Sequence, residues 1–114
     1  MTEISIDESA LESMESLLGE QFPDTLEFCC SEFERLGSET IAALGQDKEA
    51  AIRHSHSLKS NAAQFGAASL AEVARLIEYN LNNGNDEQAA DVANNLMAQV
   101  TGSQEKLNAW QAQR

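Results

Sequence analysis

The sequence predicts an all-α protein that folds as one antiparallel, up-down four-helix bundle with a short extra helix at its N-terminus. Apolar residues recur at steps of three and four along most of the chain, which is the spacing of one helix face. One proline and six glycines leave long uninterrupted segments. A chain of 114 residues suits one core and is too short for two, so residues 1–114 should form a single domain.

Two helices are expected in the first part of the chain. Ser5 and Glu8 have the spacing of a capping box, which predicts a short helix that begins there and ends at Gly19. Its apolar stripe is narrow, so this helix should lie on a larger body as a lid. Pro23 suits the first turn of a second, long helix, in which Gly37 predicts a bend or a close helix contact. The inward stripe of the second helix contains Leu26, Cys29, Phe33, Leu36 and Thr40.

The third and fourth helices are predicted to form an antiparallel hairpin. Asp47 is the expected N-cap of the third helix, and Gly66 is expected to end it in a left-handed conformation. Ser69 and Glu72 form a second capping-box pattern that opens the fourth helix, and the Asn-rich stretch 82–85 stops it. The link between the two helices is short, which favours antiparallel packing.

One last helix after Asp86 completes the expected set of four long helices and one short one. Residues 101–103, Thr-Gly-Ser, predict a kink or fraying within it. Because each long helix has an apolar stripe that the bundle would use, we expect a monomer. The inward residues of this helix are Ala89, Val92, Ala93, Leu96, Val100, Leu107 and Trp110.

Composition excludes several classes of partner. The net charge of −12, from 19 acidic and seven basic residues, argues against nucleic acid and anionic membranes. No apolar run approaches the roughly 18 residues of a membrane span, and the acidic N-terminus lacks the features of a secretory signal. Cys29 and Cys30 allow no disulfide framework and are expected to be small buried hydrophobes. A cytoplasmic protein is therefore expected.

The third helix displays a histidine. Its small or apolar stripe contains Ala51, Ser55, Leu58, Ala62 and Phe65. His56 lies about 140° from the centre of that stripe, so its ring should point to solvent. Its neighbours at three and four residues are Ile52, Arg53, Lys59 and Ser60. Two cations within reach of an exposed imidazole favour the approach of an anion.

The order His56-x-Leu58-Lys59, followed by Gly66, resembles the signature of histidine phosphotransfer (HPt) domains. That signature is usually His-x-Leu-Lys-Gly, and here Ser60 stands where the last glycine is usual. The resemblance covers the chain from Ile4 to its C-terminus and implies an antiparallel four-helix bundle. It implies that His56 is the phosphoacceptor and that Lys59 neutralises the phosphate.

Glu78 is the candidate partner of the His56 ring. A carboxylate that accepts the second ring N–H fixes the imidazole tautomer and stabilises the positive charge that forms on attack. Glu78 lies about 80° from the centre of its helix's apolar stripe, at a boundary that faces a neighbouring helix. In HPt domains the residue 22 positions after the histidine is commonly Gln or Glu, and here that residue is Glu78.

The resemblance also implies a partner, the receiver domain of a response regulator or of a hybrid sensor kinase. A phosphoryl group would pass reversibly between the receiver's aspartate and His56. The chain contains no nucleotide-binding glycine motif, so we expect no kinase activity from ATP, no cofactor and no metal of its own. Weaker charge support is expected from Arg53 or Arg75. The expected partner contacts are Ile52, Arg53, Ser60, Ala63, Gln64, Ala67 and Arg75.

The sequence leaves a second class of function open and argues against a third. A non-catalytic helical adaptor, which binds a signalling partner without phosphotransfer, stays open because of Ser60. A metal site in the bundle core would need inward-facing Glu and Glu-x-x-His pairs, which the chain lacks. His54 lies about 200° around the helix from His56, so the two rings cannot hold one metal.

Overall fold

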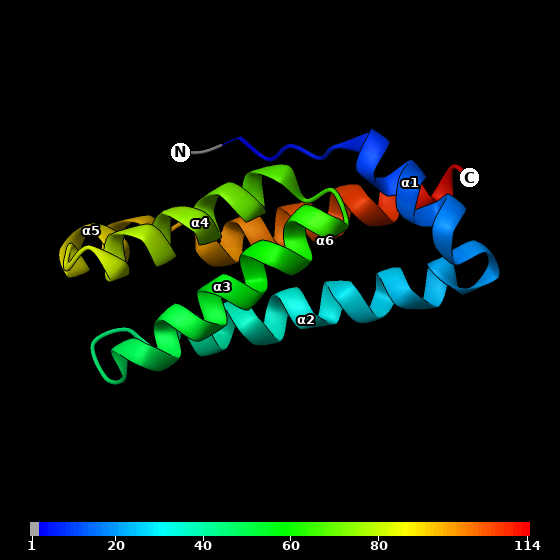
Figure 1. Cartoon of the computed structure of the whole chain (residues 1–114). Coiled ribbons are helices and arrows are strands. Elements are labelled where there is room, and N and C mark those ends of the chain that lie inside the picture. The colour runs from blue at the N-terminus through cyan, green and yellow to red at the C-terminus, as the bar shows by residue number, and fades with distance from the viewer. Residues whose placement is uncertain (1–2) are drawn as a thin grey trace.

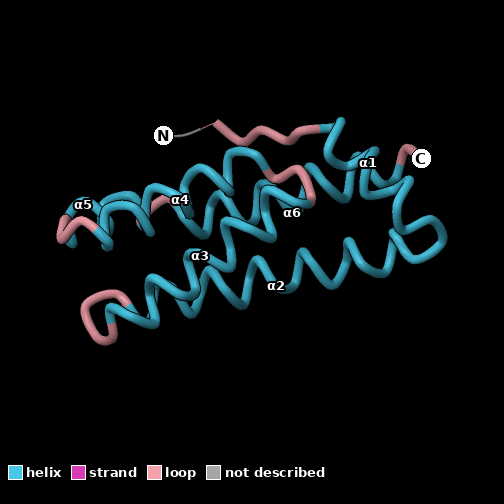
Figure 2. The backbone as a smooth tube through the Cα atoms, viewed as in Figure 1, coloured by secondary structure: helices cyan, strands magenta, loops and turns pink. Residues whose placement is uncertain are grey.

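The computed structural model describes residues 3–114 as helices joined by short turns (Figures 1 and 2). No strand occurs within those residues, which confirms the all-α prediction. A short 3-10 turn at Gly19–Gln21 joins the first two helices. The helices are α1 (Glu8–Leu18), α2 (Phe22–Ala43), α3 (Lys48–Gln64), α4 (Ala68–Asn82), α5 (Asp86–Ala93) and α6 (Leu96–Ala112).

Four long helices form the bundle. The helix α3 packs against α2 on one side and α4 on the other, and α6 also packs against α2 and α4. The helix α3 is therefore diagonal to α6, and Figure 1 shows it between α2 and α4. The short helix α1 lies against α2 and α3, as the narrow stripe predicted. The predicted hairpin is formed by α3 and α4.

Local signals placed five of the helix ends correctly. The first helix ends at Gly19, and the fourth ends in the Asn-rich stretch 82–85. Asp47 caps α3, since its carboxylate accepts a hydrogen bond from the Ala50 N–H at 3.1 Å. Pro23 lies in the first turn of α2. Gly66 takes the left-handed conformation after α3, with φ of 74°. A Cβ atom there would lie 2.5 Å from the Asp7 carbonyl oxygen, so this position requires glycine for space as well as for conformation.

The two capping-box predictions were wrong. Asp7 caps α1 in place of Ser5, and its carboxylate accepts from the Ser9 and Ala10 N–H groups. Ser69 lies inside α4, which begins at Ala68. The Ser69 hydroxyl is buried and bonds to other parts of the chain: it accepts from the Ser5 N–H at 2.9 Å and donates to the Gln99 side chain at 2.7 Å. These tertiary partners replace the local cap.

The prediction of one helix after Asp86 was also wrong. The chain turns at residues 94–95, so that α5 packs on α4 while α6 packs between α2 and α4. Residues 101–103 are helical within α6. Gly102 lies against Ile4, because a Cβ atom there would come within 2.6 Å of the Ile4 side chain. Gly37 marks a close contact between α2 and α6, because a Cβ atom added there would lie 3.0 Å from the Met97 sulfur.

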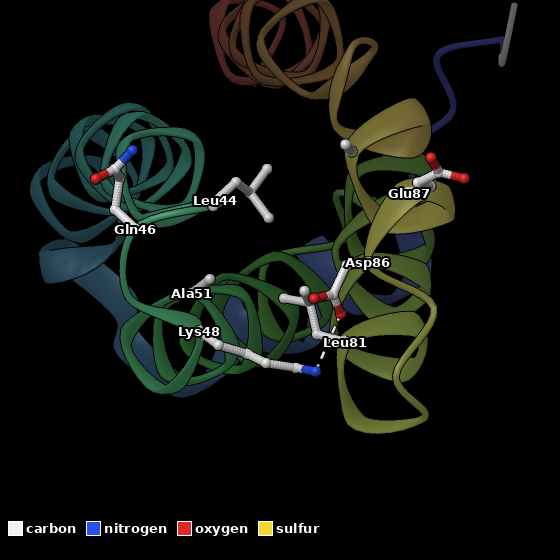
Figure 3. A pocket seen from close by; sticks show the side chains of 9 residues that line it. Leu44, Gln46, Lys48, Ala51, Leu81, Asp86 and Glu87 are labelled. Carbon is white, nitrogen blue, oxygen red and sulfur yellow. Dashed lines mark ion pairs between the residues drawn. The ribbon is translucent and has the colours of Figure 1, made fainter.

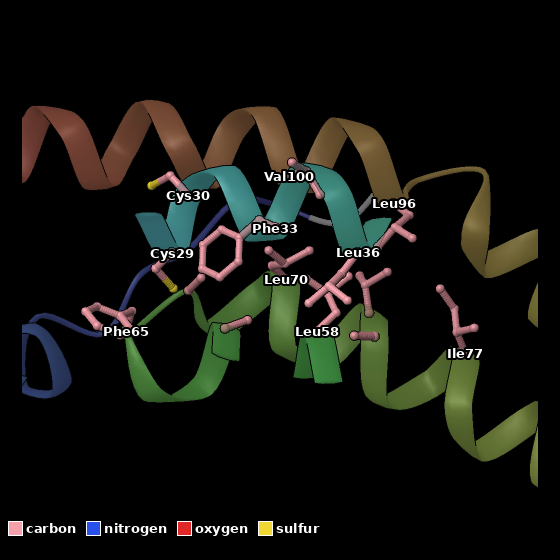
Figure 4. Close-up of a cluster of buried hydrophobic side chains, with 14 of the residues drawn as sticks. Cys29, Cys30, Phe33, Leu36, Leu58, Phe65, Leu70, Ile77, Leu96 and Val100 are labelled. Carbon is pink, nitrogen blue, oxygen red and sulfur yellow. The ribbon is translucent and has the colours of Figure 1, made fainter. Parts of the chain in front are cut away.

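The core is mostly aliphatic and draws residues from every helix. Figure 4 shows part of it. Phe33 and Leu58 are fully buried at its centre. Cys29 and Cys30 are buried as predicted, and burial raises the pKa of their thiols to about 12 and about 11. Both thiols are therefore protonated near neutral pH and act as small hydrophobes.

One end of the bundle is open between the α2–α3 turn and α5. A depression there is floored by Ala51 and Leu81, and Leu44 points into it (Figure 3). Lys48 and Asp86 also line the depression and form an ion pair of 3.0 Å (Figure 3). No helix within residues 3–114 combines the length and the apolar character that crossing a membrane requires.

Candidate functional site

The site is built on the outward side of α3. Leu58 and Ser55 are fully buried on the inward stripe of that helix, which fixes its rotation about its axis. His56 then points away from the core, and 58% of its side chain is exposed. The imidazole is therefore accessible to a partner on a helix that the core holds in place.

Glu78 reaches this histidine from α4. Its Oε2 atom lies 2.8 Å from Nδ1 of His56, so a carboxylate accepts the Nδ1–H hydrogen bond. Only 16% of the Glu78 side chain is exposed, since it lies at the seam between α3 and α4. In the neutral ring this bond leaves the lone pair on Nε2, the nitrogen that a nucleophilic attack would use.

Lys59 completes the cluster. Its ammonium group lies 2.8 Å from Oε1 of Glu78, so one carboxylate binds both α3 side chains. Burial alone would raise the pKa of Glu78. The hydrogen bonds from Lys59 and His56 outweigh that effect and hold the pKa of Glu78 below its usual value. Glu78 is therefore ionised at neutral pH and can stabilise positive charge on the His56 ring.

The family resemblance implied that Lys59 neutralises the phosphate, but the sequence did not predict the bond of Lys59 to Glu78. That pairing depends on how α3 and α4 are aligned along their axes, which the sequence spacing within one helix does not determine. The only available signal was their short link, which makes α3 and α4 neighbours. In the described structure Lys59 is thus a cation already held at the site.

All of the predicted contact residues except Ala67 are exposed or half-buried. Arg53 is exposed on α3, and Arg75 on α4 is bound by Glu72, with its two nitrogens 2.9 and 2.6 Å from the carboxylate oxygens. Ala67 is fully buried, so we remove it from the contact surface. Ile52 is half-buried, and Ser60, Ala63 and Gln64 are exposed. Ala67 is the residue just before α4. The N-terminal segment covers it, since Asp7 bonds to Gly66 and Ser5 to Ser69 on either side.

His54, the second histidine, belongs to a different surface. Its Nδ1 atom lies 3.6 Å from a Glu39 carboxylate oxygen on α2, and its side chain is 23% exposed. Within the described chain, no three His, Cys, Asp or Glu side chains converge in a way that could hold a metal ion.

Fold and site together define a helical bundle that displays one imidazole, oriented by a carboxylate and flanked by a cation. The Hpt domain family model matches residues 8–111, and the chain belongs to this family. It is therefore a phosphotransfer protein of two-component signalling, in a family of phosphoryl carriers rather than kinases.

A solved structure has the same fold. The crystal structure of histidine-containing phosphotransfer protein B (HptB) from Pseudomonas aeruginosa PAO1 superposes with a TM-score of 0.88 and 19% sequence identity, over 96% of each chain. At this identity the likeness concerns the fold. A comparison with curated protein sequences finds no match.

Proposed function

We propose that this protein relays a phosphoryl group between the aspartates of receiver domains and His56 in a two-component phosphorelay. The observation that carries the proposal is the 2.8 Å bond between Nδ1 of His56 and the Glu78 carboxylate, on a ring that is 58% exposed. This bond presents Nε2 outward in its nucleophilic form. Membership in the Hpt family supports the same role.

The proposed step is a direct transfer. The Nε2 lone pair attacks the phosphorus of an aspartyl phosphate, a P–N bond forms, and the P–O bond to the aspartate breaks so that a carboxylate leaves. The Nδ1 proton stays in its bond to Glu78, whose negative charge stabilises the imidazolium. Transfer in the reverse direction uses the same atoms. Positioning and charge neutralisation are the main requirements of phosphoryl transfer, and the receiver's acidic pocket would supply the metal ion.

Lys59 is proposed to neutralise the phosphoryl oxygens. It lies one turn after His56 on the same helix and is already at the site through its bond to Glu78. An incoming phosphoryl group carries more negative charge than one carboxylate, so the ammonium group is expected to exchange Glu78 for phosphate. The proposed contact surface around the ring consists of Ile52, Arg53, Ser60, Ala63, Gln64 and Arg75.

The test is transfer from labelled, phosphorylated receiver domains of the source organism. The protein should take up an acid-labile, base-stable label, which is the behaviour of phosphohistidine, and His56→Gln should take up none. His54→Gln is the matched control and should keep the label, because His54 lies on another surface. Label that persists on His56→Gln would refute His56 as the acceptor.

The same experiment distinguishes phosphotransfer from the alternative function as a non-catalytic adaptor. An adaptor would bind a receiver domain, and the wild-type protein would stay unlabelled at every receiver concentration. We place phosphotransfer first because an adaptor has no need of a carboxylate bonded to Nδ1 of an exposed histidine.

A further inference from the structure

We infer that Tyr79 is the apolar anchor by which this protein holds its receiver partner, an inference that rests on the proposed function. Tyr79 follows Glu78 on α4 and was not among the contacts predicted from the sequence. Its side chain is 55% exposed.

Tyr79 points outward on the surface that α3 and α4 share with His56. Ile77, two residues earlier, is fully buried, and Tyr79 lies about 200° around the helix from it. Arg75, one turn before Tyr79, is exposed on the same side of α4. The phenol ring therefore stands away from the core beside the α3 side of the hairpin.

Tyr79 also lies at the level of His56 along the bundle. The bond between His56 and Glu78 places these residues opposite each other, and Tyr79 is one residue, about 3.8 Å, further along the chain. A partner that brings an aspartyl phosphate to Nε2 covers the surface around it. A standard interface covers about 800 Å² per partner, which corresponds to a disc about 16 Å in radius. Tyr79 falls within that disc.

The rest of this surface offers little apolar area. Its exposed residues on α3 include Ser60 and Ala63, which are small, and Ile52 is half-buried. The large apolar side chains exposed within residues 3–114 are Leu17, Phe28, Ile41 and Tyr79. The first three lie on α1 and α2, so Tyr79 alone among these four projects from the hairpin that carries His56. Tyrosine is enriched among the residues that dominate binding at interfaces.

Charge and apolar contact would then have separate roles. Lys59 and Arg53 lie beside His56 in a molecule of net charge −12, and they favour the approach of an acidic receiver pocket. Their effect falls as salt screens it. The contact of the Tyr79 ring is largely independent of salt, so it would hold the complex when the charges are screened.

The experiment measures transfer from the phosphorylated receiver that charges the wild type fastest, over a series of receiver concentrations. Tyr79→Ala should raise the apparent KM about five- to thirtyfold with little change in the maximal rate, as expected for loss of one dominant contact. The increase should persist at high salt. Tyr79→Phe should stay within about twofold of the wild type, since it keeps the ring.

Ile41→Ala is the matched control. Ile41 is 39% exposed and lines a depression with Ala93 and Met97, on the side where α2 meets α5 and α6. This variant should transfer with the wild-type KM. Circular dichroism checks that each variant is folded.

Labelling by phosphoramidate measures the competence of His56 without any docking protein. In that reaction the P–N bond of the donor breaks, the phosphoryl group passes to Nε2, and ammonia leaves. The loss in Tyr79→Ala should be confined to receiver-dependent transfer. A wild-type KM for Tyr79→Ala, or an equal rise for Ile41→Ala, would overturn the inference. Failure of the wild type to accept label from any receiver would instead refute the proposed function, and the inference with it.

Discussion

Glu78 carries the chemistry of the site at the scale of single residues, because its two oxygens bind Nδ1 of His56 and the Lys59 ammonium group, each at 2.8 Å. We predict that Glu78→Ala slows phosphotransfer about ten- to hundredfold. A hydrogen bond to a charged group contributes about 1.5–3 kcal/mol, which is that factor in rate when the charge forms in the transition state. Single-turnover transfer from a phosphorylated receiver measures the effect.

The control for this prediction is Glu32→Ala. Glu32 also binds a cation, Arg35, at 2.7 Å, and its side chain is 21% exposed against 16% for Glu78. It lies on α2, so its loss should leave the transfer rate unchanged. A Glu78→Ala protein that is folded and transfers at the wild-type rate would contradict the orienting role.

At this scale the sequence predicted the residues better than their bonds. The small and apolar residues of α3 define its buried side. His56 had to be exposed because it lies on the opposite side of the helix. Glu78 was found through the need for a carboxylate partner, its boundary position on the fourth helix and one family offset. The Lys59–Glu78 ion pair was missed because it joins two helices, and periodicity within each helix says nothing about their relative shift.

At the scale of elements, predictions succeeded where the signal was local. Asp47, Pro23 and Gly66 act through their own neighbours in the chain, so their sequence positions were sufficient. Ser5 and Ser69 have the same kind of local signal, but they bond to each other across 64 residues of the chain. A capping pattern cannot indicate that tertiary partners will bind the Ser69 hydroxyl, or that Asp7 will cap α1 in place of Ser5.

Ser69 therefore gives a stability prediction for the junction of the N-terminal segment, α4 and α6. Ser69→Ala removes the acceptor of the part-buried bond from the Ser5 N–H and the donor of the buried bond to the Gln99 side chain. We expect the free energy of unfolding to fall by about 1–3 kcal/mol, the usual cost of removing one partner of a buried hydrogen bond. Urea denaturation measures it.

Ser38→Ala on the exposed side of α2 is the matched control for Ser69→Ala and should change the free energy of unfolding by less than about 0.5 kcal/mol. Equal urea midpoints for the two variants would show that the buried bonds of Ser69 add nothing to stability.

At the scale of the whole molecule, the bundle followed from apolar spacing and the α3–α4 hairpin from its short link, but the turn between α5 and α6 was not predicted. The apolar stripe continues through Ala89, Leu96 and Val100, so the pattern alone reads as one helix. The turn at residues 94–95 is set by packing, because α5 must cover α4 while α6 lies between α2 and α4. This packing requirement involves several helices at once, so the apolar pattern of one segment cannot predict it.

Acid should act on the whole molecule through its bonded carboxylates. Hydrogen bonds from neighbouring side chains hold the pKa of four surface carboxyls below the usual value, namely those of Asp7, Glu15, Glu32 and Glu72. In Glu78 the bonds from Lys59 and His56 lower the pKa against the opposing effect of burial. A group with a lowered pKa in the folded state stabilises the fold above its unfolded pKa, and this contribution is lost as the pH falls through the folded value.

Comparing the wild type with Glu78→Gln isolates the Glu78 contribution from the other carboxyls. At neutral pH the variant should be the less stable protein, because it lacks the charge that binds Lys59 and His56. The difference in free energy of unfolding should shrink from about pH 5 to about pH 3, since a protonated glutamate resembles glutamine. Urea denaturation across that range measures it, with Glu34→Gln on the exposed side of α2 as the control that shows no gap at either end. A gap between the wild type and Glu78→Gln that stays constant or widens toward acid would mean that the Glu78 charge does not stabilise the folded bundle.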